Sequence, residues 1–278
     1  REFGLKIYYC FLYSLLFSLL GYTSSGTPFV DHHSTFFCLL AVYSLLFVIK
    51  NEKNIFWILI PIFLGCAFLS KQVPAFYIFI ILLIIIIIYL FTLKKIDSLK
   101  SILLGTILFI FFMVLLILFG GIKFESFINQ YILYPQSIGN DRFNNFKPTF
   151  HGIVSHFKFI YISIAPFFFI NLKLIISEKK PFKKKDFFYF TTILLFTLSL
   201  IFHQFFTKNQ TYIFFLIPLL VGFSHIAINS ITEKKNNSIT FFLILYCILV
   251  TSKYHLRINE GRKFHELNQV NFSKSIPA

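Results

Sequence analysis

The feature that most restricts the fold of this chain is a series of long apolar runs, separated by short polar breaks, along almost its whole length. Of the 278 residues, 57% are hydrophobic and only 13% are charged. A helix that crosses the hydrocarbon core of a bilayer needs about 20 apolar residues, and the runs are close to that length. A water-soluble globular fold is therefore excluded, and the chain is predicted to be a membrane protein.

The runs predict an all-α, polytopic bundle of about nine transmembrane helices. In lipid a helix satisfies its own backbone hydrogen bonds, and these runs lack the alternation of a porin-type strand. We predict short outer loops at 22–34, 71–74 and 204–211 and a longer one at 121–156. The predicted spans are 4–21, 35–49, 55–70, 75–93, 101–120, 157–176, 187–203, 212–229 and 239–251.

The loop cations predict the orientation of the bundle. Fifteen of the 26 Lys and Arg residues fall on one side of the predicted membrane, and eleven fall on the other, five of them in the final tail. By the positive-inside rule the first side is cytoplasmic. We therefore expect a multi-pass protein of the inner (plasma) membrane, with the N-terminus of this chain in the cytoplasm and the C-terminal tail outside.

The chain divides into a transmembrane domain, 1–251, and an outer polar tail, 252–278. Because the sequence begins at Arg1 and enters an apolar run almost at once, we expect a fragment whose N-terminal part precedes Arg1.

The net charge of +15 does not indicate nucleic-acid binding, since the cations lie in short clusters between apolar runs and no aromatic-stacking module accompanies them. The sequence also lacks a P-loop, a Rossmann fingerprint, a HExxH segment and a GxSxG elbow. Nucleotide hydrolysis and serine-hydrolase chemistry therefore have no support.

An acidic residue followed by two imidazoles, Asp31-His32-His33, lies in the predicted outer loop before the second span. Such a group can act as a general base, a metal ligand or an anchor for a polar head group. The alternative is a helix N-cap, made by Asp31 or Ser34, with solvated histidines. No cofactor is predicted, and a divalent metal is left open because this spacing is not a strong ligand pattern.

A lysine, Lys71, lies in the predicted four-residue connector between the third and fourth spans. On the outer side it opposes the positive-inside bias, and an ammonium group at membrane depth is costly unless it is paired. We interpret Lys71 as a fixed cation that faces an anion. The alternative is a side chain that snorkels to lipid phosphates.

The segment around Lys71 reads Gly-Cys-Ala-Phe-Leu-Ser-Lys-Gln-Val-Pro over residues 65–74 and follows an acidic outer loop. This pattern resembles the membrane glycosyltransferases of the GT-C class, which include the dolichyl-phosphate-mannose-protein mannosyltransferases. These enzymes transfer sugars from polyprenyl-phosphate carriers and commonly carry Gly-x-x-x-Gly/Ala-x-Leu-x-Lys-x-x-Pro at this place. The resemblance covers mainly residues 26–75 and the multi-span layout.

The resemblance implies roles for two residues. In that family a catalytic Asp lies on the first large outer loop, and a further acid often lies on the next one. Asp31 matches the further acid of the next outer loop. The principal catalytic Asp is therefore expected upstream of Arg1. Lys71 matches the Lys near the lipid phosphate.

The predicted outer loop 121–156 holds two further features. Phe124, Phe127, Ile128 and Tyr131 would share one face of a short interfacial helix. Farther along, Asp141-Arg142 offers a carboxylate beside a guanidinium suited to phosphate, or alternatively a self-contained surface pair.

Two other polar outer segments each have two interpretations. Residues 203–212 would form a wall of the acceptor or lipid pocket if the resemblance holds, and a simple connector otherwise. The cations of the tail from Lys253 onward suit anionic head groups or a lipid pyrophosphate, or belong to a solvated linker.

The leading functional hypothesis is a glycosyltransferase that moves a sugar from a polyprenyl-phosphate carrier to a glycan, lipid or protein acceptor at the outer face. Asp31 is the candidate catalytic residue, and the candidate substrate-binding residues are Lys71, His32, His33, Asp141 and Arg142. The alternative is a transporter or flippase for a lipid-linked or anionic solute, without covalent chemistry. A structural membrane subunit is a third hypothesis.

Overall fold

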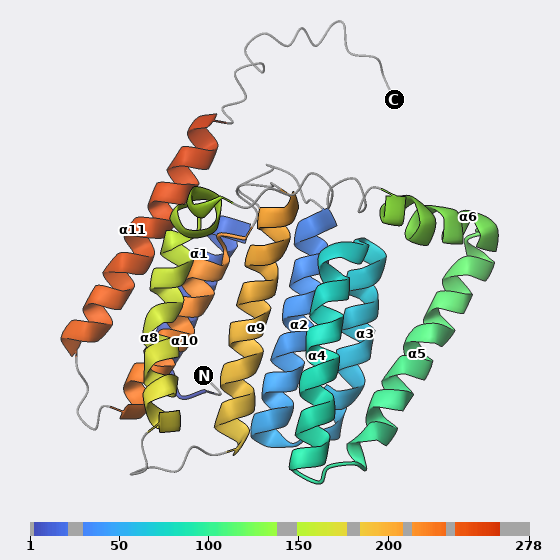
Figure 1. Ribbon diagram of the computed structural model, residues 1–278, viewed down its shortest axis with the longest axis horizontal. Helices are drawn as coiled ribbons and strands as arrows, with labels where there is room; N and C mark the ends of the chain where they lie inside the picture. The colour runs from blue at the N-terminus through green and yellow to red at the C-terminus, as the bar shows by residue number, and fades with distance from the viewer. Residues whose placement is uncertain are drawn as a thin grey trace, which may run out of the picture.

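The computed structural model describes residues 3–21, 30–137, 149–176, 184–207, 213–231 and 237–261, and the regular structure in these ranges is entirely helical (Figure 1). The helices follow the apolar runs of the sequence. Their bounds are α1 Ile7–Gly21, α2 Val30–Asn51, α3 Asn54–Ser70, α4 Gln72–Thr92, α5 Ser98–Phe119, α6 Phe124–Ile128, η1 Asn129–Leu133, η2 His151–Ser155, α8 Lys158–Ile176, α9 Lys184–Thr207, α10 Leu216–Ile231 and α11 Asn237–Gly261.

Six helices in the described ranges are long and apolar enough to cross a membrane, namely α2, α4, α5, α8, α9 and α11. Three shorter apolar helices, α1, α3 and α10, accompany them. The prediction of an all-α chain is therefore confirmed, and the candidate spans are those expected of a multi-pass membrane protein. Six of the nine predicted spans correspond to the long helices, and the other three correspond to the shorter ones.

Three helix ends extend well beyond the predicted spans, and two of them, those of α2 and α9, lie at the site described below. Helix α2 begins at Val30 instead of residue 35, α9 ends at Thr207 instead of 203, and α11 ends at Gly261 instead of 251. Hydropathy marks where the side chains become polar, whereas a helix ends where its backbone hydrogen bonding stops. Polar residues expected in loops therefore belong to helix ends.

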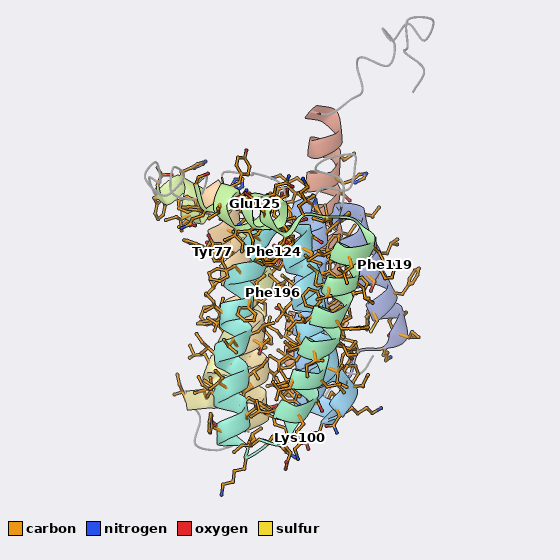
Figure 2. The ribbon with its side chains drawn as sticks, turned by 90° about the vertical axis from the view of Figure 1, so that its right-hand side faces the viewer. Tyr77, Lys100, Phe119, Phe124, Glu125 and Phe196 are labelled. Carbon is orange, nitrogen blue, oxygen red and sulfur yellow. The ribbon has the colours of Figure 1, made fainter. Side chains whose placement is uncertain are left out.

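Successive long helices alternate in direction, so the bundle has two ends (Figure 1). The α2–α3 and α4–α5 connections lie at one end with the start of α9, and Figure 2 labels Lys100 there. We call it the lysine-rich end, after Lys50, Lys53, Lys95, Lys100 and Lys185. The start of α2, the α3–α4 junction and the end of α9 lie at the opposite end, which we call the Asp31 end.

Two groups of helices make up the bundle. Helix α2 packs against α3, α4 and α9, whereas α10 packs against α8, α1 and α11. At the Asp31 end, α6 and η1 lie across the direction of the long helices (Figures 1 and 2). This is the short helix predicted there, and Phe127 stacks on Tyr131 with ring centroids 4.9 Å apart. Its place at a bilayer surface stays a prediction.

Helix α5 packs on α3 through two glycines. A Cβ atom at Gly105 would lie 2.2 Å from the carbonyl oxygen of Ile58, and one at Gly65 would lie 2.3 Å from the Phe109 ring. Small residues of this kind let membrane helices approach closely. Many other α5 side chains are exposed, up to 87% at Phe119, as expected for a helix that faces lipid.

We predict that Gly105→Leu destabilises the protein by about 1–3 kcal/mol, because the added side chain must push α3 and α5 apart. Fluorescence of Trp57, the single tryptophan of the chain, can follow unfolding in detergent, since this residue is buried on α3. The control is Ile107→Leu at a 62% exposed position of α5, which should change stability by less than about 0.5 kcal/mol. Equal stability of the two variants would contradict this packing.

Ion pairs join three segments at the lysine-rich end. The Glu52 carboxylate, between α2 and α3, accepts hydrogen bonds from Lys185 at the start of α9 and from Lys95 after α4, the latter at 2.8 Å. These bonds, with that to Lys185 the stronger, lower the pKa of Glu52 from 4.5 to about 2. The three side chains are 39–44% exposed, so the contribution to stability is that of surface pairs, below about 1 kcal/mol each.

The stabilisation by Glu52 should depend on pH. Because its pKa is lower in the folded than in the unfolded chain, the contribution is complete above about pH 5 and is lost as the pH falls toward about 2. Glu52→Gln should lower the melting temperature at neutral pH, and its difference from the wild type should shrink on acidification. Asp97→Asn, which removes an exposed pair with Lys100, should have no such effect.

Candidate functional site

Asp31 lies in the first turn of α2, and only 3% of its surface is exposed. The prediction that Asp31, His32 and His33 belong to a loop is therefore wrong. The N-cap alternative also fails, because Asp31 and Ser34 lie inside the helix and both interact with Lys71. The buried carboxylate needs a partner, since burying an unpaired charge costs several kcal/mol.

That partner is Lys71, 40 residues along the chain. Its Nζ donates hydrogen bonds to both carboxylate oxygens of Asp31, each at 2.7 Å. The Lys71 side chain is 30% exposed, whereas that of Asp31 is 4% exposed. Lys71 is thus the member of the pair that a ligand can reach, and the anion that it faces is Asp31.

The local sequence explains why Lys71 lies between two helices. Pro74 disfavours the helical conformation at the residue before it, and Val73 has φ −118° and ψ 122°. Lys71 itself is extended, with φ −164° and ψ 131°, so α3 ends at Ser70. The Ser34 hydroxyl donates to the Lys71 carbonyl oxygen at 3.0 Å and ties this junction to α2.

His203 is a third member of the site, and the sequence indicated it only within the segment 203–212, as a pocket wall or a connector. Because α9 continues to Thr207, this residue lies inside the helix and is only 1% exposed. Its Nε2 is 3.5 Å from Oδ1 of Asp31, and the Tyr77 ring of α4 lies beside it with centroids 6.2 Å apart. The sequence signals were the polar segment 203–212 and a histidine at the predicted end of a span.

Gln204 supports the end of α9 beside this site. Its Oε1 accepts a hydrogen bond from the backbone N–H of Ile213 at 2.8 Å, and its Nε2 lies 3.3 Å from Nε2 of His156. The segment predicted as a connector therefore begins as a helix whose side chains anchor the next segment.

The other predicted site residues have different positions. His32 is buried on α2 with its ring centroid 6.2 Å from that of Phe36, whereas His33 is exposed. Asp141 and Arg142 lie outside the described residues. Of the six predicted residues, the structure joins Asp31 and Lys71 directly.

The arrangement combines a shielded carboxylate, a reachable ammonium group and an imidazole. It offers a cation for an anionic ligand and a carboxylate that becomes available as a base when its lysine is drawn away. Within the described ranges no three His, Cys, Asp or Glu side chains are placed to share a metal ion.

We predict strong coupling between Asp31 and Lys71 in stability. Asp31→Asn or Lys71→Met should each cost about 3–5 kcal/mol, because each leaves a buried or half-buried charge without its partner. The double variant should cost clearly less than the two single changes together. Denaturant unfolding followed by Trp57 fluorescence measures this double-mutant cycle, and additive losses would show that the pair is not formed.

Comparison of the chain with protein-family models, with curated proteins and with solved structures finds no match.

Proposed function

We propose that Asp31, Lys71 and His203 belong to the active site of a membrane glycosyltransferase that uses a polyprenyl-phosphate-linked sugar. The observation that supports this proposal is the ion pair itself, in which Lys71 is open to a ligand and Asp31 is shielded behind it. The similarity of residues 26–75 to the GT-C class suggests the same chemistry. The acceptor is a glycan, a lipid or a protein at the outer face of the membrane.

The phosphate of the donor lipid suits Lys71. Its ammonium group lies at an end of the bundle, beside the start of α4, where a lipid head group can approach. In the reaction the bond between the anomeric carbon and the phosphate oxygen breaks, and polyprenyl phosphate leaves with the electron pair. A fixed cation at that oxygen stabilises the charge as it develops.

Asp31 would act as the general base. While it holds Lys71, its carboxylate accepts two hydrogen bonds and is a weak base. When the donor phosphate draws the Lys71 side chain toward itself, the carboxylate is released to take the proton of the acceptor hydroxyl. The acceptor oxygen then bonds to the anomeric carbon, and the proton stays on Asp31.

His203 is a positioning residue in this scheme. At 3.5 Å from Oδ1 it holds the carboxylate in place after Lys71 turns away. The Tyr77 ring lies beside the imidazole on one side and is itself in contact with Phe202.

A flippase for a lipid-linked or anionic solute is a second candidate, favoured by another buried polar group. His225 of α10 is 1% exposed, its Nδ1 is hydrogen-bonded to the Tyr13 hydroxyl at 3.1 Å, and its Nε2 lies 3.3 Å from Thr240 Oγ1. Paired polar groups inside spans are typical of transport pathways. The experiment therefore has to separate consumption of the lipid from its movement.

We predict that proteoliposomes of the protein release polyprenyl phosphate from a panel of polyprenyl-phosphate hexoses and pentoses with a radiolabelled sugar. Asp31→Asn should lower turnover by about 10²–10⁴-fold, as expected for loss of a general base. Lys71→Ala should lower it by about 10²–10³-fold, as expected for loss of leaving-group stabilisation.

Glu52→Gln serves as the control, because it removes an ion pair at the far end of the bundle and should leave turnover unchanged. Each variant is compared at equal folded amount, measured by Trp57 fluorescence. Movement of the intact donor across the bilayer without release of polyprenyl phosphate would favour the flippase. Full turnover in folded Asp31→Asn would exclude Asp31 as the base.

A further inference from the structure

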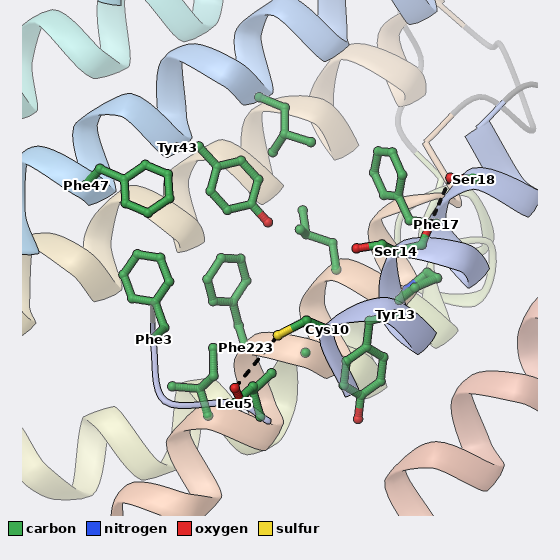
Figure 3. A pocket seen from close by; sticks show the side chains of 15 residues that line it. Phe3, Leu5, Cys10, Tyr13, Ser14, Phe17, Ser18, Tyr43, Phe47 and Phe223 are labelled. Carbon is green, nitrogen blue, oxygen red and sulfur yellow. Dashed lines mark hydrogen bonds between the residues drawn. The ribbon is translucent and has the colours of Figure 1, made fainter. Parts of the chain in front are cut away.

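A cavity of about 500 Å³ lies between α1, α2 and α10, away from the Asp31–Lys71 pair (Figure 3). Its wall is mainly apolar and aromatic. Prominent lining residues are Phe3, Phe17, Leu39, Tyr43, Phe47 and Phe223. The volume falls within the roughly 300–1,000 Å³ of small-molecule sites in proteins.

The cavity is elongated along α2. Leu39, Tyr43 and Phe47 recur every four residues on the face of α2 that lines it, so the wall extends about 12 Å at 1.5 Å per residue. The Tyr43 hydroxyl points into the space in Figure 3. A mostly apolar space that follows α2 suits a hydrocarbon chain that runs along the helix axis.

Aromatic rings separate this cavity from the Asp31 end. Phe17, Phe36 and Phe215 form a mutual cluster, with centroid distances of 5.7, 5.2 and 5.3 Å. Phe36 lies between Asp31 and Leu39 along α2, so the cluster stands between the candidate active site and the cavity. An occupant of the cavity therefore approaches from the other end or from the side.

The lysine-rich end of the cavity carries a cation. Phe3 and Phe47 stack with centroids 5.7 Å apart, and the Lys50 Nζ lies 4.8 Å from the centroid of Phe3. Lys50 is exposed at the end of α2, and Lys6 is exposed just before α1. A basic residue near the surface attracts anionic lipid by about 1 kcal/mol.

The cavity is also open at the side. Ser14 and Ser18 of α1 line it and are themselves exposed, so the space is not a sealed void. In a bilayer an unfilled apolar space of this size forfeits dispersion contacts along its whole wall, and an inserted chain restores them.

We propose that this cavity binds an acyl chain of an anionic glycerophospholipid, whose phosphate lies beside Lys50 and Lys6 at the lysine-rich end. The apolar wall recognises the chain, and the two lysines select the negative head group. The bound lipid fills the space between α1 and α2, and so it stabilises the packing of α1 on the bundle. This proposal is independent of the function proposed for Asp31.

Native mass spectrometry of the protein taken from vesicles can test the proposal. The probes are phosphatidylglycerol and phosphatidylcholine with identical acyl chains, and polyprenyl phosphate as a third lipid. The wild type should retain phosphatidylglycerol in preference to phosphatidylcholine. Phosphatidylglycerol should also raise its melting temperature more than phosphatidylcholine does.

Two kinds of variant separate the chain site from the head-group site. Gly222→Leu adds a side chain into the cavity, since a Cβ there meets only the Tyr13 ring at 3.5 Å, and it should reduce retained phosphatidylglycerol at least tenfold. Ser14→Phe fills the cavity from α1, and it replaces Gly222→Leu in the test if Gly222→Leu does not fold. Lys50→Gln should keep chain binding and weaken the preference for the anionic lipid, whereas Lys53→Gln, a matched control at the residue before α3, should keep both.

Three results would overturn the proposal. The first is equal retention of the two phospholipids by the wild type. The second is undiminished retention of phosphatidylglycerol by both Gly222→Leu and Ser14→Phe, which would show that the lipid binds elsewhere on the surface. The third is preferential retention of polyprenyl phosphate that Gly222→Leu abolishes, which would assign the cavity to a donor lipid.

Discussion

The contact between Asp31 and Lys71 is the constraint on which the Asp31 end of the bundle depends. A carboxylate with 4% exposure in the first turn of a membrane helix is tolerable only with a cation beside it, and that cation comes from the α3–α4 junction. The pair therefore fixes the start of α2 against α3 and α4, and Ser34 strengthens the connection through the Lys71 carbonyl oxygen. Because His203 approaches the same carboxylate, α9 is drawn to the same point. Four helices thus meet around one negative charge.

This convergence has a chemical consequence that a purely structural ion pair would lack. The two members are unequally covered, so an anionic ligand can compete for Lys71 without first unfolding its surroundings. Competition of this kind takes the ammonium group away from the Asp31 carboxylate, which keeps the His203 imidazole nearby. The binding of a phosphate and the basicity of the carboxylate are then linked through the same side chain, and this linkage makes group transfer from a lipid phosphate a coherent proposal.

The sequence predicted the spans and two of the site residues, and physical reasons explain what it missed. Asp31 and Lys71 stood out because each is a charge in an apolar setting, which hydropathy reveals directly. Their contact could not be predicted, because the packing of α2 on α3 and α4 brings together residues 40 positions apart. His203 was predicted only as part of the segment 203–212, because the end of α9 was placed at 203 instead of Thr207. The short helix after α5 was predictable from its spacing of aromatic residues, but its π-type continuation over Asn129–Leu133 was not.

Helix α2 presents different environments on two of its faces, and its sequence encodes both. Asp31, Cys38 and Leu45 are spaced seven residues apart, are buried and share one face of the helix. On the nearly opposite face, Phe36 and Tyr43 are spaced in the same way and lie toward α1 and α10, with Phe36 in the ring cluster and Tyr43 in the cavity wall. The buried charge of α2 is therefore confined to the first turn of one face, and bulky rings that line the cavity occupy the other. Periodicity identifies both faces as buried, but it cannot tell close packing from a cavity, because that difference depends on how far α1 stands from α2. The sequence thus specifies which surface of α2 can receive a hydrocarbon chain, and only the tertiary arrangement leaves the room for it.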